Sequence, residues 1–555
     1  MHLLSLPTEI ITQIFLNLTW KDILKSKSVC KAVYELSQST ALQYHVLLGI
    51  AGYRDGPSNH PMSKSQRLGL LRRLESSFNY GDFSQKERIP LSGYTPTYQL
   101  QSGIFLQGRH ALGPNYRTSG VNVFRLPSAS DNRDGGVSWK LPDLVRPIRD
   151  LDVDPIQDLL VLIEGGLLGS TAIETSFVSL TTGDPHPLSS GSYTMPISTT
   201  RNVASFTTIV MGSLMGLLVS DLRFIIYDWK KGKTEVDLPF DNIDPVNSFF
   251  FLDQSHFGLI RGGRRPAQIE IHKLKYNEEI SSGSDLTAVY HLLAVKDNIT
   301  VGEITCRSDP PPNVNDISTS YTDNQVYSTP PFIPRLEDRV LILEMMFWRS
   351  VDLIATCVIA VRAETLMKIP EKSICVDGVY VVTADLWMDE THMQPSMIGG
   401  NWACFVYGSR FVTLSFLDPI NFMGEPDDDD DDDDDDDNGQ KLFWPVEIFI
   451  LDMNPRLVAW AESKGCDETP FGINRTETID RRIRKSSELV MHNILQEPWH
   501  GGCPAIATRF IAEGVTARAA DDFAVMLDGE RLIIVKLKVN ADHTRLPLYM
   551  DIYHS

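Results

Sequence analysis

The sequence predicts a multidomain protein in which a small α-helical unit precedes a large all-β region. Through about residue 80, apolar residues recur at the three- and four-residue spacing of helices. From about residue 95 onward, short runs rich in β-branched and aromatic residues alternate with Gly, Pro, Asn and Asp, which is typical of strands and turns. The chain has 555 residues, several times the ~150 of an average domain, so a single compact core is not expected.

The acidic character of the chain comes largely from one segment. The formal net charge is -21, and eleven of the 72 acidic residues form an uninterrupted run from Asp427 to Asp437. Adjacent carboxylates repel one another, so we expect an acidic disordered insert at about 424–440. The rest of the chain is only moderately acidic, which disfavours the broad basic surface of a nucleic-acid-binding protein.

The cysteine pattern and the apolar segments indicate the compartment. The seven cysteines are widely spaced and form no CxxC pair, so the sequence predicts neither a disulfide framework nor a zinc ribbon. The longest apolar stretch, 340–361, carries Glu344, Arg349 and Asp352, whose charges disfavour a membrane span. We expect a cytoplasmic or nuclear protein without a cofactor, a metal or a contact with membranes.

The first fifty residues predict two or three short helices. Pro7 suits the first position of a helix, and Glu9 adds negative charge near the positive end of its dipole. Thr19, three residues before Asp22, resembles a capping box and predicts a second helix from about Trp20. The apolar stripe of the first helix is wide, and a unit this small cannot cover it alone, so we expect a second protein to bury part of it.

The same segment resembles an F-box. The resemblance is carried by LPxE, then I-x-x-x-I-F-x-x-L, then D-I-L and V-C-K, over residues 4 to about 45. It implies docking onto a Skp-type adaptor protein, and through it onto a cullin. The matching positions are Leu6, Pro7, Ile10, Ile14, Leu18, Ile23, Leu24, Val29 and Cys30. The alternative is that the stripe is the internal core of a helical cap on the chain's own downstream domain.

A loop and one further helix are expected between the two halves. Residues 53–64 are rich in Gly, Pro, Ser and Asn, and apolar residues at helical spacing follow over 68–78. The helix is either a connector between the halves or a packing helix on the next domain. We therefore divide the chain into an F-box (1–48), a loop and connecting helix (49–94) and a β domain (95–555).

Apolar runs in the β domain predict strands and hairpins. The clearest runs are 158–164, 223–229, 267–274, 411–417, 446–452 and 530–538. Asp221 marks the turn of one expected hairpin, and Asp528 with Gly529 gives a strong tight-turn signal in another.

The length of the β domain predicts radial repetition. A single sandwich cannot hold some 460 residues, whereas small sheets arranged around an axis can. Strand ends at Leu180, Trp229 and Leu274 recur at about the period of a WD-type blade, and Tyr227-Asp228 resembles the end of such a repeat. We predict a degenerate WD-like β-propeller of about seven blades, with paired β-domains as the alternative. The whole arrangement is similar to F-box proteins of mushroom-forming fungi.

Few residues suggest binding or catalysis within the β domain. Arg261, Arg264 and Arg265 crowd one turn and are candidates for gripping an acidic or phosphorylated substrate, or are an ordinary solvated surface. The Gly-rich HGGC at 500–503 has no recognisable catalytic partners, and no nucleophile elbow, phosphate-binding loop or HExxH occurs.

The resemblance to an F-box implies a non-catalytic subunit of a ubiquitin ligase. The helices would dock the Skp adaptor and the β domain would bind an unknown target protein. The alternatives are a Skp-binding interaction protein outside a cullin ligase, or a propeller enzyme with an unrecognised site.

Overall fold

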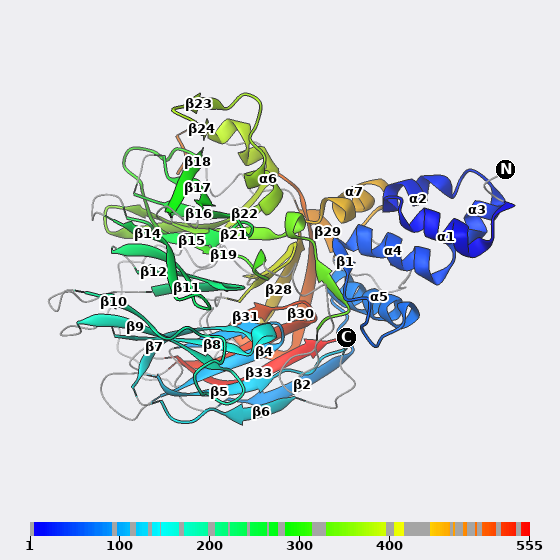
Figure 1. The fold of residues 1–555 in the computed structure, drawn as a ribbon. Coiled ribbons are helices and arrows are strands. Elements are labelled where there is room, and N and C mark those ends of the chain that lie inside the picture. The colour runs from blue at the N-terminus through cyan, green and yellow to red at the C-terminus, as the bar shows by residue number, and fades with distance from the viewer. Residues whose placement is uncertain are drawn as a thin grey trace, which may run out of the picture.

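The computed structural model shows a helical unit mounted on a large β domain (Figure 1). It describes residues 5–91, 97–110, 118–130, 136–144, 146–165, 171–197, 206–219, 222–240, 245–263, 266–275, 283–312, 329–395, 404–415, 444–466, 470–471, 481–484, 494–496, 502–517, 523–539 and 545–555. The acidic run 427–437 and the expected insert at 424–440 lie outside these residues.

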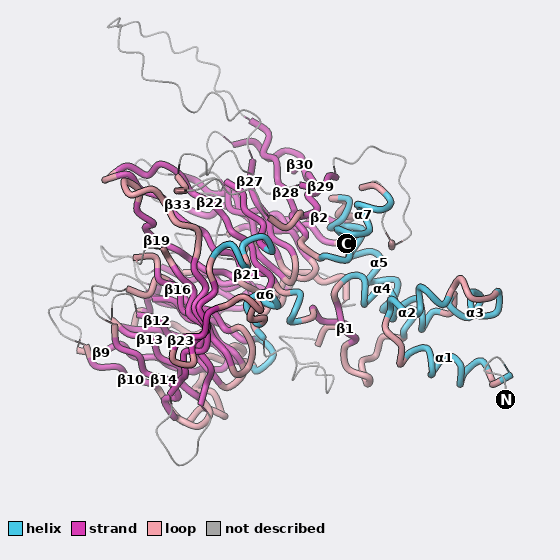
Figure 2. Tube along the Cα trace, turned by 90° about the horizontal axis from the view of Figure 1, so that it is seen from above, coloured by secondary structure: helices cyan, strands magenta, loops and turns pink. Residues whose placement is uncertain are grey.

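Five helices form the N-terminal unit, which projects from one side of the β domain (Figure 2). They are α1 (Thr8–Leu16), α2 (Trp20–Ser26), α3 (Lys31–Ser37), α4 (Thr40–Ala51) and α5 (Lys64–Tyr80). The expected helix start at Trp20 is confirmed, because the Thr19 hydroxyl caps α2 by accepting the Asp22 amide. α5 begins with a capping box between Ser63 and Gln66.

The β domain is a ring of seven blades, each built on four antiparallel strands. The hairpin of β23 (Ile374–Val376) and β24 (Val379–Val382) extends blade 4, and one further strand extends blade 6. Blade 1 contains β3 (Tyr98–Gln101), β4 (Ile104–His110), β5 (Thr118–Arg125) and β6 (Val137–Lys140). Blade 2 contains β7 (Ile148–Asp154), β8 (Leu159–Gly165), β9 (Ala172–Ser179) and β10 (Tyr193–Pro196). Blade 3 contains β11 (Phe206–Met211), β12 (Leu214–Val219), β13 (Arg223–Asp228) and β14 (Lys233–Pro239). Blade 4 contains β15 (Ser248–Phe251), β16 (His256–Arg261), β17 (Gln268–Lys275) and β18 (Gly283–His291).

The remaining blades are built less regularly along the chain. Blade 5 contains β19 (Thr300–Arg307), β21 (Val340–Arg349), β22 (Asp352–Arg362) and β25 (Thr391–Pro395). Blade 6 contains β26 (Val406–Tyr407), β27 (Arg410–Ser415), β28 (Trp444–Asp452) and β30 (Ala505–Ala517), with β29 (Arg481–Arg484) added at its edge. Blade 7 contains β31 (Phe523–Leu527), β32 (Arg531–Val539), β33 (Arg545–His554) and β2 (Gln85–Pro90).

Apolar layers between neighbouring blades close the ring. Each pair of adjacent blades shares a layer of buried side chains, including the pair formed by blades 7 and 1. Because both faces of most blades are covered, these strands read as near-continuous apolar runs in the sequence. The prediction of a propeller of about seven blades is confirmed, and paired β-domains are excluded.

The predicted strands and hairpins have the expected pairing. All six apolar runs overlap strands, namely β8, β13, β17, β27, β28 and β32. β12 pairs with β13 as expected, although Asp221 itself lies outside the described residues. The turn between β31 and β32 is held by Asp528, whose carboxylate accepts the amides of Glu530 and Arg531 at 2.9 Å each.

The first strand of the ring lies earlier in the chain than we expected. β2 pairs along its whole length with β33, so blade 7 joins a strand from before residue 95 to three strands from the end of the chain. Arg88 and Lys86 on β2 pair with the buried Asp551 carboxylate, at 2.6 Å and 3.1 Å. The boundary drawn at 95 therefore falls inside the propeller, because the partner of β2 is remote in sequence.

A buried polar network fixes the helical unit on the propeller. Glu75 of α5 is fully buried and accepts a hydrogen bond from Arg410 of β27 at 2.6 Å, and Arg410 also pairs with Asp452 at 2.8 Å. Burial raises the pKa of Glu75, and the Arg410 guanidinium opposes that rise. Beside it, Asn454 donates to the Ile50 carbonyl at 2.9 Å, just before α7 (Pro455–Lys464). α5 is thus a packed helix that joins the two halves rigidly.

Candidate protein-interaction surface

The first three helices have one covered side and one open side. On the covered side, Ile11, Phe15, Ile23 and Val33 are at most 6 % exposed and belong to one core with α4 and α5. α2 and α4 pack closely, because a Cβ added to Gly49 of α4 would clash with the Trp20 ring of α2. This core holds the helices together without Ile10, Ile14, Leu18, Val29 and Tyr34, which are not part of it.

The open side carries an unusual density of exposed apolar side chains. We call it the helical apolar face, formed by Ile10, Ile14, Leu18, Val29 and Tyr34, which are 37–74 % exposed. These are five of the thirteen large hydrophobic residues that are exposed in the described part of the chain, although they lie within only 25 residues. Ile10 and Ile14 are four residues apart on α1 and therefore lie on one side of that helix. Exposed apolar side chains that share one side of a helix are typical of a protein-interaction site.

The nine residues selected from the sequence divide between the two sides. Ile10, Ile14, Leu18 and Val29 lie on the helical apolar face, and Pro7 is exposed beside them. Leu6, Leu24 and Cys30 are half-buried against the core. Ile23 has no exposed surface, so as a contact residue it is a wrong choice, and it supports α2 from inside. Tyr34 of α3 is also exposed, at 52%, although it is not one of the nine residues that match the F-box pattern.

A groove of about 850 Å³ opens beside this face, between α1, α2 and α7. It is lined by Leu18, Trp20, Lys21, His45 and Arg456, with further residues from both halves of the molecule. Arg456 is paired with Asp338, whereas Lys21 is exposed. The groove therefore adds basic and polar groups to the edge of an otherwise apolar surface.

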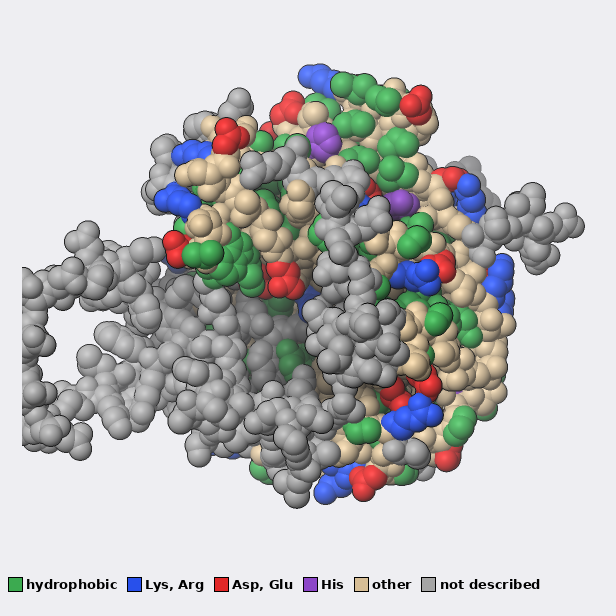
Figure 3. Space-filling view, turned by 90° about the vertical axis from the view of Figure 1, so that its left-hand side faces the viewer, with side chains coloured by type: hydrophobic (Ala, Val, Ile, Leu, Met, Phe, Trp, Pro, Cys, Tyr) green, Lys and Arg blue, Asp and Glu red, His purple; other side chains and the backbone are tan. Residues whose placement is uncertain are grey.

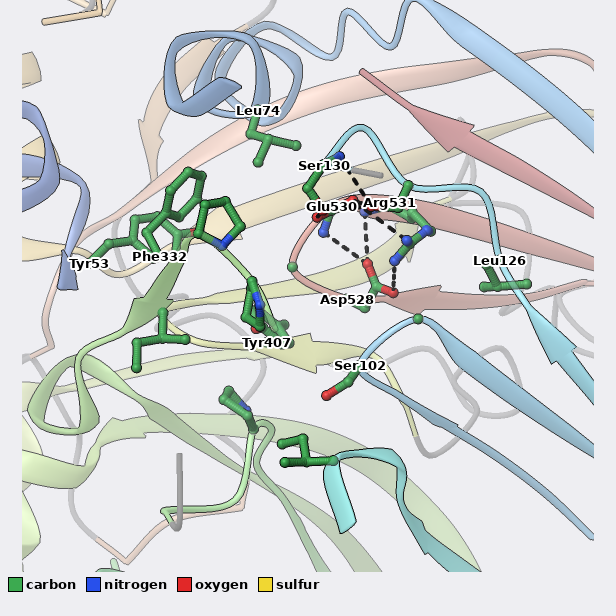
Figure 4. Close-up of a pocket in the computed structure, with 18 of the residues that line it drawn as sticks. Tyr53, Leu74, Ser102, Leu126, Ser130, Phe332, Tyr407, Asp528, Glu530 and Arg531 are labelled. Carbon is green, nitrogen blue, oxygen red and sulfur yellow. Dashed lines mark hydrogen bonds and ion pairs between the residues drawn. The ribbon is translucent and has the colours of Figure 1, made fainter. Parts of the chain in front are cut away.

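A second cavity, of about 100 Å³, lies where turns of blades 1 and 7 approach β20 (Phe332–Pro334), which pairs with β1 (Tyr53–Asp55) (Figure 4). Glu530 on its wall accepts hydrogen bonds from the hydroxyls of Ser128 at 2.5 Å and Ser130 at 2.8 Å. Arg531 pairs with Asp528 at 2.6 Å. These charged groups hold the loop around residue 128 on blade 7, which explains their burial without a ligand.

Carboxyl groups near the innermost strands carry raised pKa values. Burial raises the pKa of Asp152 on β7 to about 7. Asp309, which follows β19, has a pKa of about 8 because of burial and the nearby Asp528 and Asp152 carboxylates. In the described part of the chain, no group of three or more His, Cys, Asp or Glu side chains could hold a metal ion.

The raised pKa of Asp309 gives a prediction about pH. The folded chain holds this proton more tightly than the unfolded chain, where the pKa is ~3.9, so ionisation of Asp309 lowers stability as the pH rises from about 4 to 8. We expect Asp309→Asn to reduce the loss of thermal stability between pH 5 and pH 8. Calorimetric melting temperatures of both proteins at the two pH values measure this. Parallel slopes for wild type and variant would contradict it.

Of the three arginines of the predicted turn, only Arg261 lies within the described residues. Arg261 is mostly buried, pairs with Glu270 at 2.9 Å and stacks over Phe240. Burial would raise the pKa of Glu270, but hydrogen bonds from His272 and Arg261 outweigh it and hold that pKa at about 2. Arg264 and Arg265 lie outside the described residues. Arg261 is therefore a structural residue of blade 4 rather than a free anion-binding group.

The HGGC segment offers no sign of an activated thiol. Cys503 is half-buried, and burial raises the pKa of its thiol, which is the opposite of what a cysteine nucleophile needs. Its carbonyl is hydrogen-bonded to the His392 ring at 2.9 Å. His500 lies outside the described residues.

Comparison with known proteins gives structural likeness alone. No protein-family model matches the sequence, and no curated protein matches it. Among solved structures, the C-terminal WD40 domain of Sif2 matches with a TM-score of 0.32 and 7% identity, over 85% of this chain and 98% of that one. A chain of a mitotic checkpoint complex matches with a TM-score of 0.32 and 8% identity, over 85% of this chain and 95% of that one. The WD40 propeller domain of Doa1 matches with a TM-score of 0.26 and 12% identity, over 54% of this chain and 86% of that one. Within the described residues, no helix is both long enough and apolar enough to cross a membrane.

Proposed function

We propose that this chain is the substrate-recognition adaptor of a Skp/cullin/F-box ubiquitin ligase. In this proposal α1–α3 dock a Skp-type adaptor through the helical apolar face, and the propeller binds the target protein. The observation that carries it is the separation of the two sides: the core of the helical unit is complete without Ile10, Ile14, Leu18 and Val29, which match the F-box pattern and remain exposed.

The energetics of docking agree with a surface of this composition. Each buried Leu or Ile contributes roughly 1.5–3 kcal/mol, so four of them give about 6–12 kcal/mol before the association cost of about 4–15 kcal/mol. Apolar burial alone would barely hold a complex. The groove beside Leu18, with Lys21 and His45 on its wall, supplies polar groups that can add to it.

The rigid mounting of the helical unit supports the same role. In such a ligase the transfer of ubiquitin is performed by partner proteins, and the adaptor contributes proximity. The buried Glu75–Arg410–Asp452 network holds the propeller at a fixed offset from the helical apolar face. A bound target would therefore be held at a defined distance from the docked adaptor.

Co-purification tests the proposal. The full chain, a Skp-type adaptor and a cullin are expressed together, and the chain is captured. We expect both partners to be recovered. Recovery of the adaptor without the cullin would favour an interaction protein outside the ligase, and recovery of neither partner would overturn the proposal.

A further inference from the structure

Basic side chains dominate the wall of the groove beside the helical apolar face. The groove lies where the helical unit meets the propeller, with α2 and α7 on its two sides (Figure 1). Lys21, Arg335 and Arg456 line it together with His45, and none of its described lining residues is Asp or Glu. A cleft lined by charges of one sign concentrates the electric field, so this groove attracts anions.

The chain itself neutralises only part of this positive charge. Arg456 pairs with the buried Asp338, but its Nε is buried and has no hydrogen-bond partner among the described residues. The Arg335 guanidinium is 3.8 Å from the carboxylate of Glu337, which is 52% exposed, and an ion pair this long and exposed contributes little. Lys21 is exposed and has no ion-pair partner in the described part of the chain. The groove therefore keeps positive charge that a ligand can use.

Further lysines extend this charge along the helical apolar face. Residues 10–34, which carry that face, contain four lysines and one aspartate, whereas the whole chain has a net charge of -21. Lys25 and Lys27 have no described ion-pair partner, and partial burial lowers the pKa of Lys27. On the side of the propeller turned away from the helical unit, the basic and acidic side chains that are described lie next to one another (Figure 3). An excess of positive charge thus gathers around the face and the groove.

The groove and the helical apolar face form one continuous surface. Leu18 belongs to both, since it is 37% exposed on the face and also lines the groove. A protein that covers Leu18 therefore reaches the mouth of the groove. Apolar burial on the face alone would barely offset the cost of association, so a second, polar contact in the groove is what a docked protein needs.

We propose that the groove binds an acidic segment of the same protein that docks on the helical apolar face. This inference rests on the proposed function and adds the chemistry of the partner: an adaptor that carries aspartate or glutamate side chains beside its apolar contact surface. Their carboxylates would lie against Lys21, Arg335 and the unsatisfied side of Arg456. Continuity through Leu18 favours the adaptor over the competing occupant, which is the chain's own acidic run at 427–437.

Binding of a purified Skp-type adaptor to the full chain at low and high salt tests the proposal. We expect Lys21→Glu to weaken binding by about tenfold or more at low salt, mainly through slower association, and by less at high salt, because salt screens exposed charges. Arg335→Gln should act in the same direction by a smaller factor. Arg456 is left unchanged, because its loss would leave Asp338 buried without its partner.

Lys372→Glu is the matched control for this experiment. Lys372 is exposed just before β23, far from the helical unit, and its substitution changes the net charge of the chain by the same amount. It should bind the adaptor as the wild type does, and all variants should melt at the temperature of the wild type. Equal affinities of wild type, Lys21→Glu and Lys372→Glu would overturn the acidic contact and leave the adaptor role intact. A wild type that does not bind the adaptor at all would overturn both.

A peptide probe examines the groove without the adaptor. Fluorescence anisotropy measures the binding of a short oligoglutamate peptide to the full chain, with oligoglutamine as the neutral control. We expect the wild type to bind only the acidic peptide, Lys21→Glu to bind it several-fold less tightly, and excess adaptor to displace it. Equal weakening by Lys21→Glu and Lys372→Glu would show that the groove is not the site.

The same probe separates the two occupants. A variant with a Gly-Ser repeat in place of residues 427–437 should bind oligoglutamate as tightly as the wild type does. Tighter binding by this variant would show that the chain's own acidic run fills the groove, and it would overturn the assignment to the adaptor.

Discussion

Ile14→Glu is expected to weaken binding of a Skp-type adaptor by about 100-fold or more while the propeller stays folded. Ile14 is 39% exposed on the helical apolar face and does not belong to the core beneath it. In the complex, the substitution removes an aliphatic contact of ~1.5–3 kcal/mol and buries an unpaired carboxylate. In the free protein the glutamate remains in water, so the fold should not change. Binding is measured by calorimetric titration with the purified adaptor.

Two further variants make this result specific. Ile10→Glu should act like Ile14→Glu, since Ile10 is 48% exposed one helical turn away. Val137→Glu places the same charge on a valine of blade 1 that is 46% exposed, and it should bind with unchanged affinity. If Ile14→Glu and Val137→Glu bind equally well, the helical apolar face is not the docking surface.

Glu75→Ala is expected to destabilise the protein by about 3–5 kcal/mol, because it leaves the Arg410 guanidinium buried with only Asp452 as an acidic partner. The loss should appear first at the junction of α5 with blade 6. Urea unfolding measures the stability, and limited proteolysis of the folded protein locates the weakened segment. Removal of one partner is costly because the remaining charge cannot reach water.

The exposed pair Lys31 and Glu35 provides the matched control. These side chains are 88% and 64% exposed on α3, so Glu35→Ala should change stability by less than about 0.5 kcal/mol. The double variant Glu75→Met with Arg410→Met should recover much of the loss, since an apolar pair of similar size leaves no buried charge. Equal effects of Glu75→Ala and Glu35→Ala would show that the buried network does not stabilise the junction.

The sequence predicts local structure well because local structure has local causes. The six apolar runs become strands since each is long enough and apolar enough to be covered on both sides. The Asp528-Gly529 turn forms because its carboxylate caps its own backbone. The same Asp-Gly signal stands at 377–378, between two short β-branched runs, and it would have predicted the hairpin of β23 and β24.

Remote pairing explains what the sequence could not supply. Glu75 and Arg410 are 335 residues apart, and nothing near either of them indicates the other. Ile23 and Ile14 look equivalent in an apolar pattern, and only the position of α4 decides that one is covered and the other is open. For the same reason the start of the ring at β2 was misplaced.

The closing blade has a consequence for how the ring is made on the ribosome. β2 leaves the ribosome early, but β33 follows about 450 residues later, a delay of roughly 20 to 90 s at ~5–20 residues per second. During that time β2 is an unpaired edge strand, because β33 has not yet been synthesised. Its sequence, Gln85-Lys86-Glu87-Arg88-Ile89-Pro90, is charged and ends in proline, which keeps a waiting edge from joining the wrong neighbour. Lys86 and Arg88, which later pair with Asp551, therefore also disfavour incorrect strand pairing in the nascent chain before blade 7 is complete.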